Sequence, residues 1–139
     1  MSATGAPGSG GEPRRGGRAA PISNAARRRR EVWVEGEDAV AAWYQARGYD
    51  VLARNWRCRE GELDLIARDR RRYVFCEVKS RSSTTFGAPV EAVTRTKQAR
   101  IRRLAVRWLQ HEAPARSLEI RFDVASVLDG TIEVVEGAF

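Results

Sequence analysis

Hydrophobic and polar positions follow two different periods along this chain, and the changes of period predict the order of its elements. From Trp33 to Arg47 apolar residues recur at three- and four-residue spacing, which indicates an amphipathic helix, and Gly48 is placed to end it. A second pattern of this kind predicts a long helix from about 90 to 111. Alternating or short apolar runs predict strands over 49–56, 62–68, 73–79, 118–127 and 131–135. The order α-β-β-β-α-β-β favours an α/β or α+β domain, with a mixed sheet flanked by helices.

Two hairpins can be placed within this order. Asp129-Gly130 between the last two strands is a favoured type I′ turn. Strands 62–68 and 73–79 predict a second hairpin, and a two- or a four-residue loop gives the same register. One face then pairs Leu63 with Val78, Leu65 with Cys76, and Ala67 with Val74, which is apolar throughout. The other face pairs Ile66 with Phe75, Asp64 with Glu77, and Glu62 with Lys79.

This register makes Asp64 and Glu77 direct cross-strand neighbours, with Cβ atoms about 5 Å apart. Two such carboxylates repel by roughly 3 kcal/mol at an effective dielectric constant of about 20. A sheet keeps the arrangement only with compensation, from a bound divalent cation or from Lys79 two residues along the same face. Glu37 lies seven residues before Tyr44, on the buried stripe of the first helix, and could complete an acidic pocket.

Three acids and a lysine are what metal-dependent phosphodiester hydrolysis requires. Carboxylates favour hard ions, so Mg²⁺ or Mn²⁺ is the expected metal. Such a metal lowers the pKa of a bound water, while a lysine can stabilise the added negative charge of the transition state. The alternative is that Asp64 and Glu77 are solvated, or ion-paired on an exposed face. Hydrophobic neighbours on the same face favour a covered site: they are Ile66, Tyr73 and Phe75.

Several basic residues are candidates for contacts with nucleic acid. Lys97 lies at the edge of the buried seam of the second helix, where it reaches a phosphate or Glu37, or else only extends its ammonium into water. Arg100 and Arg103 belong to the strongly basic exposed face of this helix, which is either solvated or a surface for phosphate. Arg57 and Arg81 lie in predicted turns or loops, with the same two interpretations.

Charge and composition separate a tail from a domain. The net charge is +7, but residues 1–30 alone carry seven arginines and one acid, with many glycines and prolines. This predicts a disordered Arg/Gly/Pro-rich tail over 1–30 and one folded domain over 31–139. No apolar run approaches the roughly 20 residues that a membrane span needs. Two cysteines fit a reducing compartment, the cytoplasm, and the single His111 excludes sites that need two imidazoles.

Asp64 followed by Glu77-Val78-Lys79 resembles the signature of PD-(D/E)XK nucleases, and Glu37 looks like the additional acid of the Holliday-junction resolvases in that superfamily. A closer resemblance, over nearly all of 35–139, is to the bacterial YraN family. The matching pieces are Gly36-Glu37, Gly48-Tyr49, Arg54-Asn55-Trp56-Arg57, Gly61-Glu62-Leu63-Asp64-Leu65-Ile66, Phe75-Cys76-Glu77-Val78-Lys79, Arg81, Phe86-Gly87, Lys97 and Arg121-Phe122-Asp123-Val124. Leu63 departs from the superfamily, which has proline before the first aspartate.

The resemblance implies a restriction endonuclease-like core with Glu37, Asp64, Glu77 and Lys79 at its site. The leading hypothesis is therefore an endonuclease acting on DNA, with structured or branched DNA as a candidate substrate. Glu37, Asp64 and Glu77 would hold Mg²⁺ or Mn²⁺, and Lys79 would assist the attacking water. The alternatives are a non-catalytic nucleic-acid-binding module with this fold and a protein-docking domain. A homodimer would be needed to cut both strands of a symmetric junction.

Overall fold

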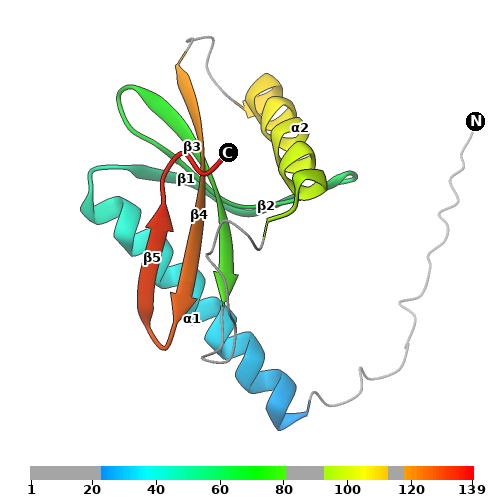
Figure 1. Ribbon diagram of the computed structural model, residues 1–139, viewed down its shortest axis with the longest axis vertical. Helices are drawn as coiled ribbons and strands as arrows, with labels where there is room; N and C mark the ends of the chain where they lie inside the picture. The colour runs from blue at the N-terminus through cyan, green and yellow to red at the C-terminus, as the bar shows by residue number, and fades with distance from the viewer. Residues whose placement is uncertain (1–22, 81–92, 113–117) are drawn as a thin grey trace, which may run out of the picture. The chain divides into compact units, whose positions relative to one another are not determined.

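The computed structural model describes residues 23–80, 93–112 and 118–139 of the chain. The chain divides into two units, Met1–Arg30 and Glu31–Phe139, and the sheet belongs to the second. The elements, labelled in Figure 1, are α1 (Asn24–Ala46), β1 (Asp50–Cys58), β2 (Gly61–Arg68), β3 (Arg72–Ser80), α2 (Arg95–Glu112), β4 (Glu119–Leu128) and β5 (Thr131–Val135). This confirms the predicted order.

The five strands form one mixed sheet in the order β1-β2-β3-β4-β5. Neighbouring strands are antiparallel except β3 and β4, which are parallel. Parallel neighbours need a crossover between them, and α2 lies in the connection from β3 to β4. The hairpin of β4 and β5 turns at Asp129 and Gly130, whose φ angles are both positive, as a type I′ turn requires. The predicted α/β architecture is confirmed.

The first helix differs from the prediction at its start and agrees with it at its end. α1 begins at Asn24, well before the predicted Trp33, and the hydroxyl of Ser23 caps it by accepting the backbone N–H of Ala26 at 3.1 Å. Disorder over 1–30 is therefore wrong for 24–30, and residues 1–22 lie outside the described residues. The helix ends as predicted: Gly48 has φ +87°, and Tyr49 donates its N–H to the Tyr44 carbonyl.

Each face of the sheet carries its own hydrophobic core. Residues alternate along β3, so that Tyr73 and Phe75 pack into one cluster and Val74, Cys76 and Val78 into the other. The first cluster includes the buried face of α2, namely Ile101, Leu104, Ala105 and Trp108. The second includes Val40, Ala41 and Tyr44 of α1. The α2 face and the α1 face of the sheet are named accordingly below.

A buried polar network fastens α1 and the C-terminal turn to β4. Asp123 on β4 is fully buried, and its carboxylate accepts hydrogen bonds from the Tyr44 hydroxyl (2.5 Å) and the Gly137 N–H (3.0 Å). Arg121 completes the set with two further hydrogen bonds of 2.8 and 2.9 Å to the same carboxylate. Burial, followed by the nearby Cys76 and Asp123, raises the pKa of Tyr44 above its ordinary range, so the phenol stays protonated as the donor.

The register of the β2–β3 hairpin is the predicted one over its inner part. Leu65 pairs with Cys76, Ala67 with Val74, and Ile66 with Phe75. The predicted partnership of Leu63 with Val78 is wrong, because Leu63 packs into the core on the α2 face whereas Val78 packs on the α1 face. The β2–β3 ladder ends at Leu65 and Cys76, so the predicted strand pairs Asp64–Glu77 and Glu62–Lys79 are not part of it. Glu62 is paired with Arg57 on β1.

The reason is a coordinated break in the alternation of both outer strands. Leu63 and Ile66 on β2 are three residues apart, yet both pack on the α2 face. Ala53 and Trp56, their partners on β1, show the same departure. Asn55 lies between these partners with φ +51°, a left-handed conformation that asparagine tolerates better than most residues. The break therefore occurs at Asn55 and the facing Asp64, and it separates the outer end of β2 from β3.

Candidate active site

An acid–lysine cluster, consisting of Asp64, Glu77, Lys79 and Lys97, lies on the α2 face where β2 leaves the regular ladder with β3. Asp64 comes from β2, Glu77 and Lys79 from β3, and Lys97 from the first turn of α2. The Asp64 carboxylate accepts the backbone N–H of Val78 at 2.9 Å. A side-chain oxygen thus takes a donor that the strand ladder would otherwise use, and this holds Asp64 beside Glu77.

Two ammonium groups converge on one oxygen of Glu77. Lys97 Nζ lies 2.6 Å from Glu77 Oε1, and Lys79 Nζ lies 3.3 Å from the same atom. The Glu77 side chain is only 7% exposed, whereas those of Lys79 and Lys97 are 26% and 35% exposed. The acid is therefore buried beneath lysines that still reach solvent. The prediction that Lys97 reaches Glu37 is wrong, because its partner is Glu77.

Burial and the neighbouring Glu77 disturb the ionisation of Asp64 in a direction that favours a cation. Burial, followed by the charge of Glu77, raises the pKa of Asp64 to about 7. The hydrogen bond from Val78 opposes this rise without cancelling it. Near neutral pH, Asp64 is therefore about equally protonated and ionised. A cation held between the carboxyl groups would compete with this proton.

The two lysines are affected in opposite directions. Burial and the neighbouring Lys97 lower the pKa of Lys79 from its ordinary value, although Glu77 partly opposes this. Burial would also lower the pKa of Lys97, but its hydrogen bonds with Glu77 and Lys79 and the negative charges of Glu77 and Asp64 together raise it. Lys97 is thus the fixed counter-charge of Glu77. Lys79 is the lysine that gives up a proton more readily.

Glu37 is buried, as the helical pattern predicts, but it belongs to a different set of contacts. Its Oε2 accepts a hydrogen bond from Asn55 Nδ2 at 3.0 Å and lies 4.0 Å from Arg54 Nη2. Its Oε1 is buried without a hydrogen-bond partner among the described residues. The strand break at Asn55 therefore connects Glu37 on the α1 side with the region of Asp64, the residue facing Asn55. This role of Asn55 could not be predicted from the sequence, because it depends on the φ angle of Asn55 and on its hydrogen bond with Glu37.

The donor set can be tested for its fit to a divalent metal ion. Within 23–80, 93–112 and 118–139, no three His, Cys, Asp or Glu side chains lie close enough together to form a metal-binding group. Two features nevertheless fit a cation: the paired carboxyl groups of Asp64 and Glu77, and the unpartnered Oε1 of Glu37. Asp64 and Glu77 are the residues that would hold the ion, and Glu37 is linked to the strand break through its hydrogen bond with Asn55.

The remaining predicted nucleic-acid contacts are scattered. Arg57 is exposed and pairs with Glu62 at 3.3 Å. Arg100 and Arg103 lie on the exposed side of α2, beyond Lys97. Arg81 lies outside the described residues. Among the described members of this set, Lys97 alone lies directly at the acid–lysine cluster.

Comparison with known proteins gives the chain its family. The model described as "Uncharacterised protein family UPF0102", the YraN family, matches residues 36–127. The chain belongs to this family. A UPF0102 protein of Beutenbergia cavernae is 56% identical over 98 residues, covering 70% of this chain and 81% of the relative. One of Frankia casuarinae is 51% identical over 109 residues, covering 75% and 92%.

The UPF0102 match confirms the family resemblance noted in the sequence, and the matched range contains the whole acid–lysine cluster together with Glu37 and Asn55. It excludes residues 1–35 and stops before β5. Neither α1 nor α2 is both long enough and apolar enough to cross a bilayer.

Proposed function

We propose that this UPF0102 protein is a metal-dependent endonuclease that hydrolyses phosphodiester bonds in DNA, with branched or structured DNA as its substrate. The observation that carries the proposal is the acid–lysine cluster. Two carboxyl groups share a partly buried position, one of them with its pKa raised to about 7, and two lysines lie beside them. Clusters of this kind are common at catalytic sites and costly elsewhere.

The residues of the acid–lysine cluster would have separate roles in the reaction. Asp64 and Glu77 would hold Mg²⁺ or Mn²⁺, which when bound lowers the pKa of a water and neutralises charge on the phosphate. Lys97, at 2.6 Å from Glu77, holds that carboxylate in position. Lys79 lies 3.3 Å from Glu77, is 26% exposed, and would donate hydrogen bonds to the phosphate as negative charge develops on its oxygens.

The choice of DNA rests on the kind of substrate that such a site and surface accept. A phosphodiester is an anion, and the acid–lysine cluster is bordered on α2 by a series of exposed arginines. The preference for branched DNA comes from the resemblance of Glu37, Asp64, Glu77 and Lys79 to the resolvase arrangement. Cutting a symmetric junction would further require two copies of the chain.

The decisive experiment offers the purified full chain linear duplex, single-stranded, flapped and four-way-junction DNA, with Mg²⁺, with Mn²⁺ and with chelator. We expect cleavage only with metal, and on the branched substrate in preference to the others. Glu77→Gln should abolish cleavage while retaining the shape of the side chain. Asp50→Asn, an equivalent change at an exposed position of β1, is the matched control and should cleave normally. Metal-independent cleavage, or cleavage unaffected by Glu77→Gln, would contradict the proposal.

A non-catalytic DNA-binding module is the second candidate, and one observation favours it. Lys97 and Lys79 already supply Glu77 with two positive charges, and no group of three acids forms in the described part of the chain. In that case Lys79 and Lys97 would contact phosphate without hydrolysing it. Binding to the same four DNAs with no cleavage under any metal condition, and with normal binding by Glu77→Gln, would favour this second function.

A further inference from the structure

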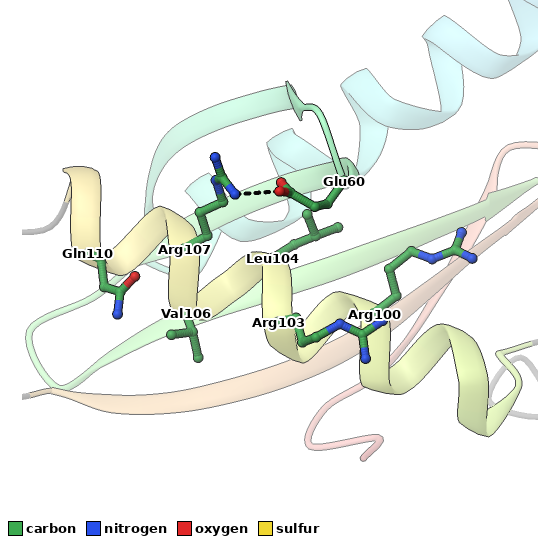
Figure 2. A pocket seen from close by; sticks show the side chains of 7 residues that line it. All are labelled: Glu60, Arg100, Arg103, Leu104, Val106, Arg107 and Gln110. Atoms are coloured by element: carbon green, nitrogen blue, oxygen red, sulfur yellow. Dashed lines mark hydrogen bonds and ion pairs between the residues drawn. The ribbon is translucent and has the colours of Figure 1, made fainter.

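The side of α2 next to the β1–β2 turn is hollowed by a groove of about 520 Å³ that is separate from the acid–lysine cluster. Figure 2 shows the seven residues that line it: Glu60, Arg100, Arg103, Leu104, Val106, Arg107 and Gln110. Three of these are arginines on one helix, spaced three and four residues apart, so they lie along one side of it. None of the seven belongs to the acid–lysine cluster.

The groove has a firm wall, because the β1–β2 turn packs tightly against α2. A Cβ atom added at Gly61 would lie 3.2 Å from Leu104 Cδ1 and 3.6 Å from Arg100 Cδ. Only glycine allows this approach without displacing the helix side chains. The aliphatic part of the Arg100 side chain is therefore packed against the turn, which restricts where its guanidinium group can lie. Figure 2 shows Arg100 and Arg103 both extending toward the N-terminal part of α2.

The charges in the groove are unevenly balanced. Arg107 Nη1 lies 2.6 Å from Glu60 Oε1, so one arginine is neutralised at one end. Within the part of the chain that the structure describes, Arg100 and Arg103 form no ion pair with an acid. Two neighbouring guanidinium groups without a counter-charge attract an anion, and arginine binds phosphate with two parallel hydrogen bonds.

The position of the groove relative to Lys97 indicates which anion fits. Lys97 and the groove are on the same helix, and a rise of about 1.5 Å per residue places Arg100, Arg103 and Arg107 about 4.5, 9 and 15 Å beyond Lys97 along its axis. A strand of duplex DNA carries one phosphate per roughly 3.4 Å of helix axis. A strand lying along α2 would thus present several phosphates to this series. A single small anion would use only part of it.

We infer that this groove binds the sugar–phosphate backbone of the DNA strand that is cut at the acid–lysine cluster, a few nucleotides from the scissile bond. That the bound strand is the one that is cut rests on the proposed nuclease function. That the groove contacts phosphates rests on the groove alone. Arg100 and Arg103 bind the phosphates. Glu60 pairs with Arg107 and neutralises its charge, which limits how far the backbone is bound along the helix.

Binding of the full chain to duplex and four-way-junction DNA, measured with chelator over a series of salt concentrations, tests the groove without requiring cleavage. In Arg100→Gln/Arg103→Gln the slope of log K against log salt should become shallower by about 1.8, or about 0.9 for each phosphate that the variant no longer binds. Arg70→Gln/Arg71→Gln is the matched control. It removes the same charge from exposed positions in the β2–β3 turn, at the other end of β2. This control should keep the wild-type slope.

Glu60→Gln should have the opposite effect and steepen the slope by up to about 1, because it frees Arg107 for a further phosphate. With metal, the groove variant should need more DNA for half-maximal cleavage while its maximal rate stays unchanged. Equal salt slopes for the groove and control variants, with normal thermal unfolding of both, would overturn the inference even if cleavage is found. A shallower slope in the groove variant without cleavage of any substrate would support the groove and contradict the nuclease function.

Discussion

Asp64 and Asp123 are both withdrawn from solvent in the same sheet, but their surroundings differ in kind. Asp123 on β4 accepts hydrogen bonds from Tyr44, Arg121 and Gly137, so its charge is matched by donors on every side. Asp64 on β2 accepts one backbone N–H from Val78 and lies beside a second acid, Glu77. The Asp123 carboxylate is therefore satisfied by hydrogen bonds from within the protein. The Asp64 carboxyl group lacks such a set of partners, and a buried carboxyl group without enough partners is where a ligand is expected.

The first way to sharpen this comparison is to remove the satisfied aspartate. Asp123→Ala should lower the free energy of unfolding by about 3–5 kcal/mol, because it leaves the Arg121 charge and the Tyr44 hydroxyl without their partner. Chemical denaturation at constant pH measures this loss. Asp129→Asn, which replaces an exposed acid in the β4–β5 turn with a residue that tolerates positive φ, is the control and should change stability little. A loss as small as that of the control would contradict the structural role assigned to Asp123.

The second test concerns Lys79, which lies beside Glu77 in the acid–lysine cluster. Lys79→Ala should retain the fold and DNA binding but cleave at least about a hundred-fold more slowly, as when one transition-state stabiliser is removed. Single-turnover rates at saturating protein measure the chemical step apart from binding. Arg68→Ala, at the other end of the hairpin register, where Arg68 pairs with Tyr73 and not with Glu77, is a suitable control. A rate for Lys79→Ala equal to that of the control would remove Lys79 from the mechanism.

The third test uses the pH dependence of stability without metal. The folded-state pKa of Asp64 is raised to about 7, so the folded protein binds more protons than the unfolded chain between about pH 4 and pH 7. The stability of the wild-type protein in chelator should therefore fall as pH rises through this window and level off above it. Asp64→Asn removes this contribution and should be more stable than the wild-type protein at pH 8.

Unfolding midpoints of Asp64→Asn and wild-type protein at pH 5 and pH 8, in chelator, give the comparison. The difference between the two proteins should widen from the lower to the higher pH. Adding Mn²⁺ at pH 8 should raise the wild-type midpoint and leave that of Asp64→Asn nearly unchanged, because the variant lacks one of the two metal-binding carboxylates. A difference that stays constant with pH would show that Asp64 is ionised throughout and that its environment is no less complete than that of Asp123.

Much of the acid–lysine cluster could be predicted because its central relation is local. The side-chain period of a strand and the length of one hairpin loop are enough to give the inner register, and they bring Asp64 close to Glu77, although the paired residues of the two strands stop at Leu65 and Cys76. The start of α1 could also have been predicted from the sequence, since Ser23 is a good N-cap residue. The arginines that follow Ser23 favoured a disordered tail instead.

The partners of the cluster could not be predicted in this way. Lys97 pairs with Glu77 and not with Glu37 because α2 packs on one face of the sheet and α1 on the other. Leu63 changes faces because β1 and β2 break their alternation together, at Asn55 and Asp64. Neither relation has a period that can be found in the sequence, since both depend on how distant elements are packed.

By itself, therefore, the sequence determined the order of the elements, the inner hairpin register and the juxtaposition of Asp64 with Glu77. These depend on backbone geometry that repeats every two or every 3.6 residues. Only the tertiary structure decided that Glu77 is held by Lys97, that Glu37 binds Asn55, and that Arg100 and Arg103 line a groove against the β1–β2 turn. These contacts join elements distant in the chain, and their distances are set by which side chains can be buried together without leaving a charge or a cavity unfilled.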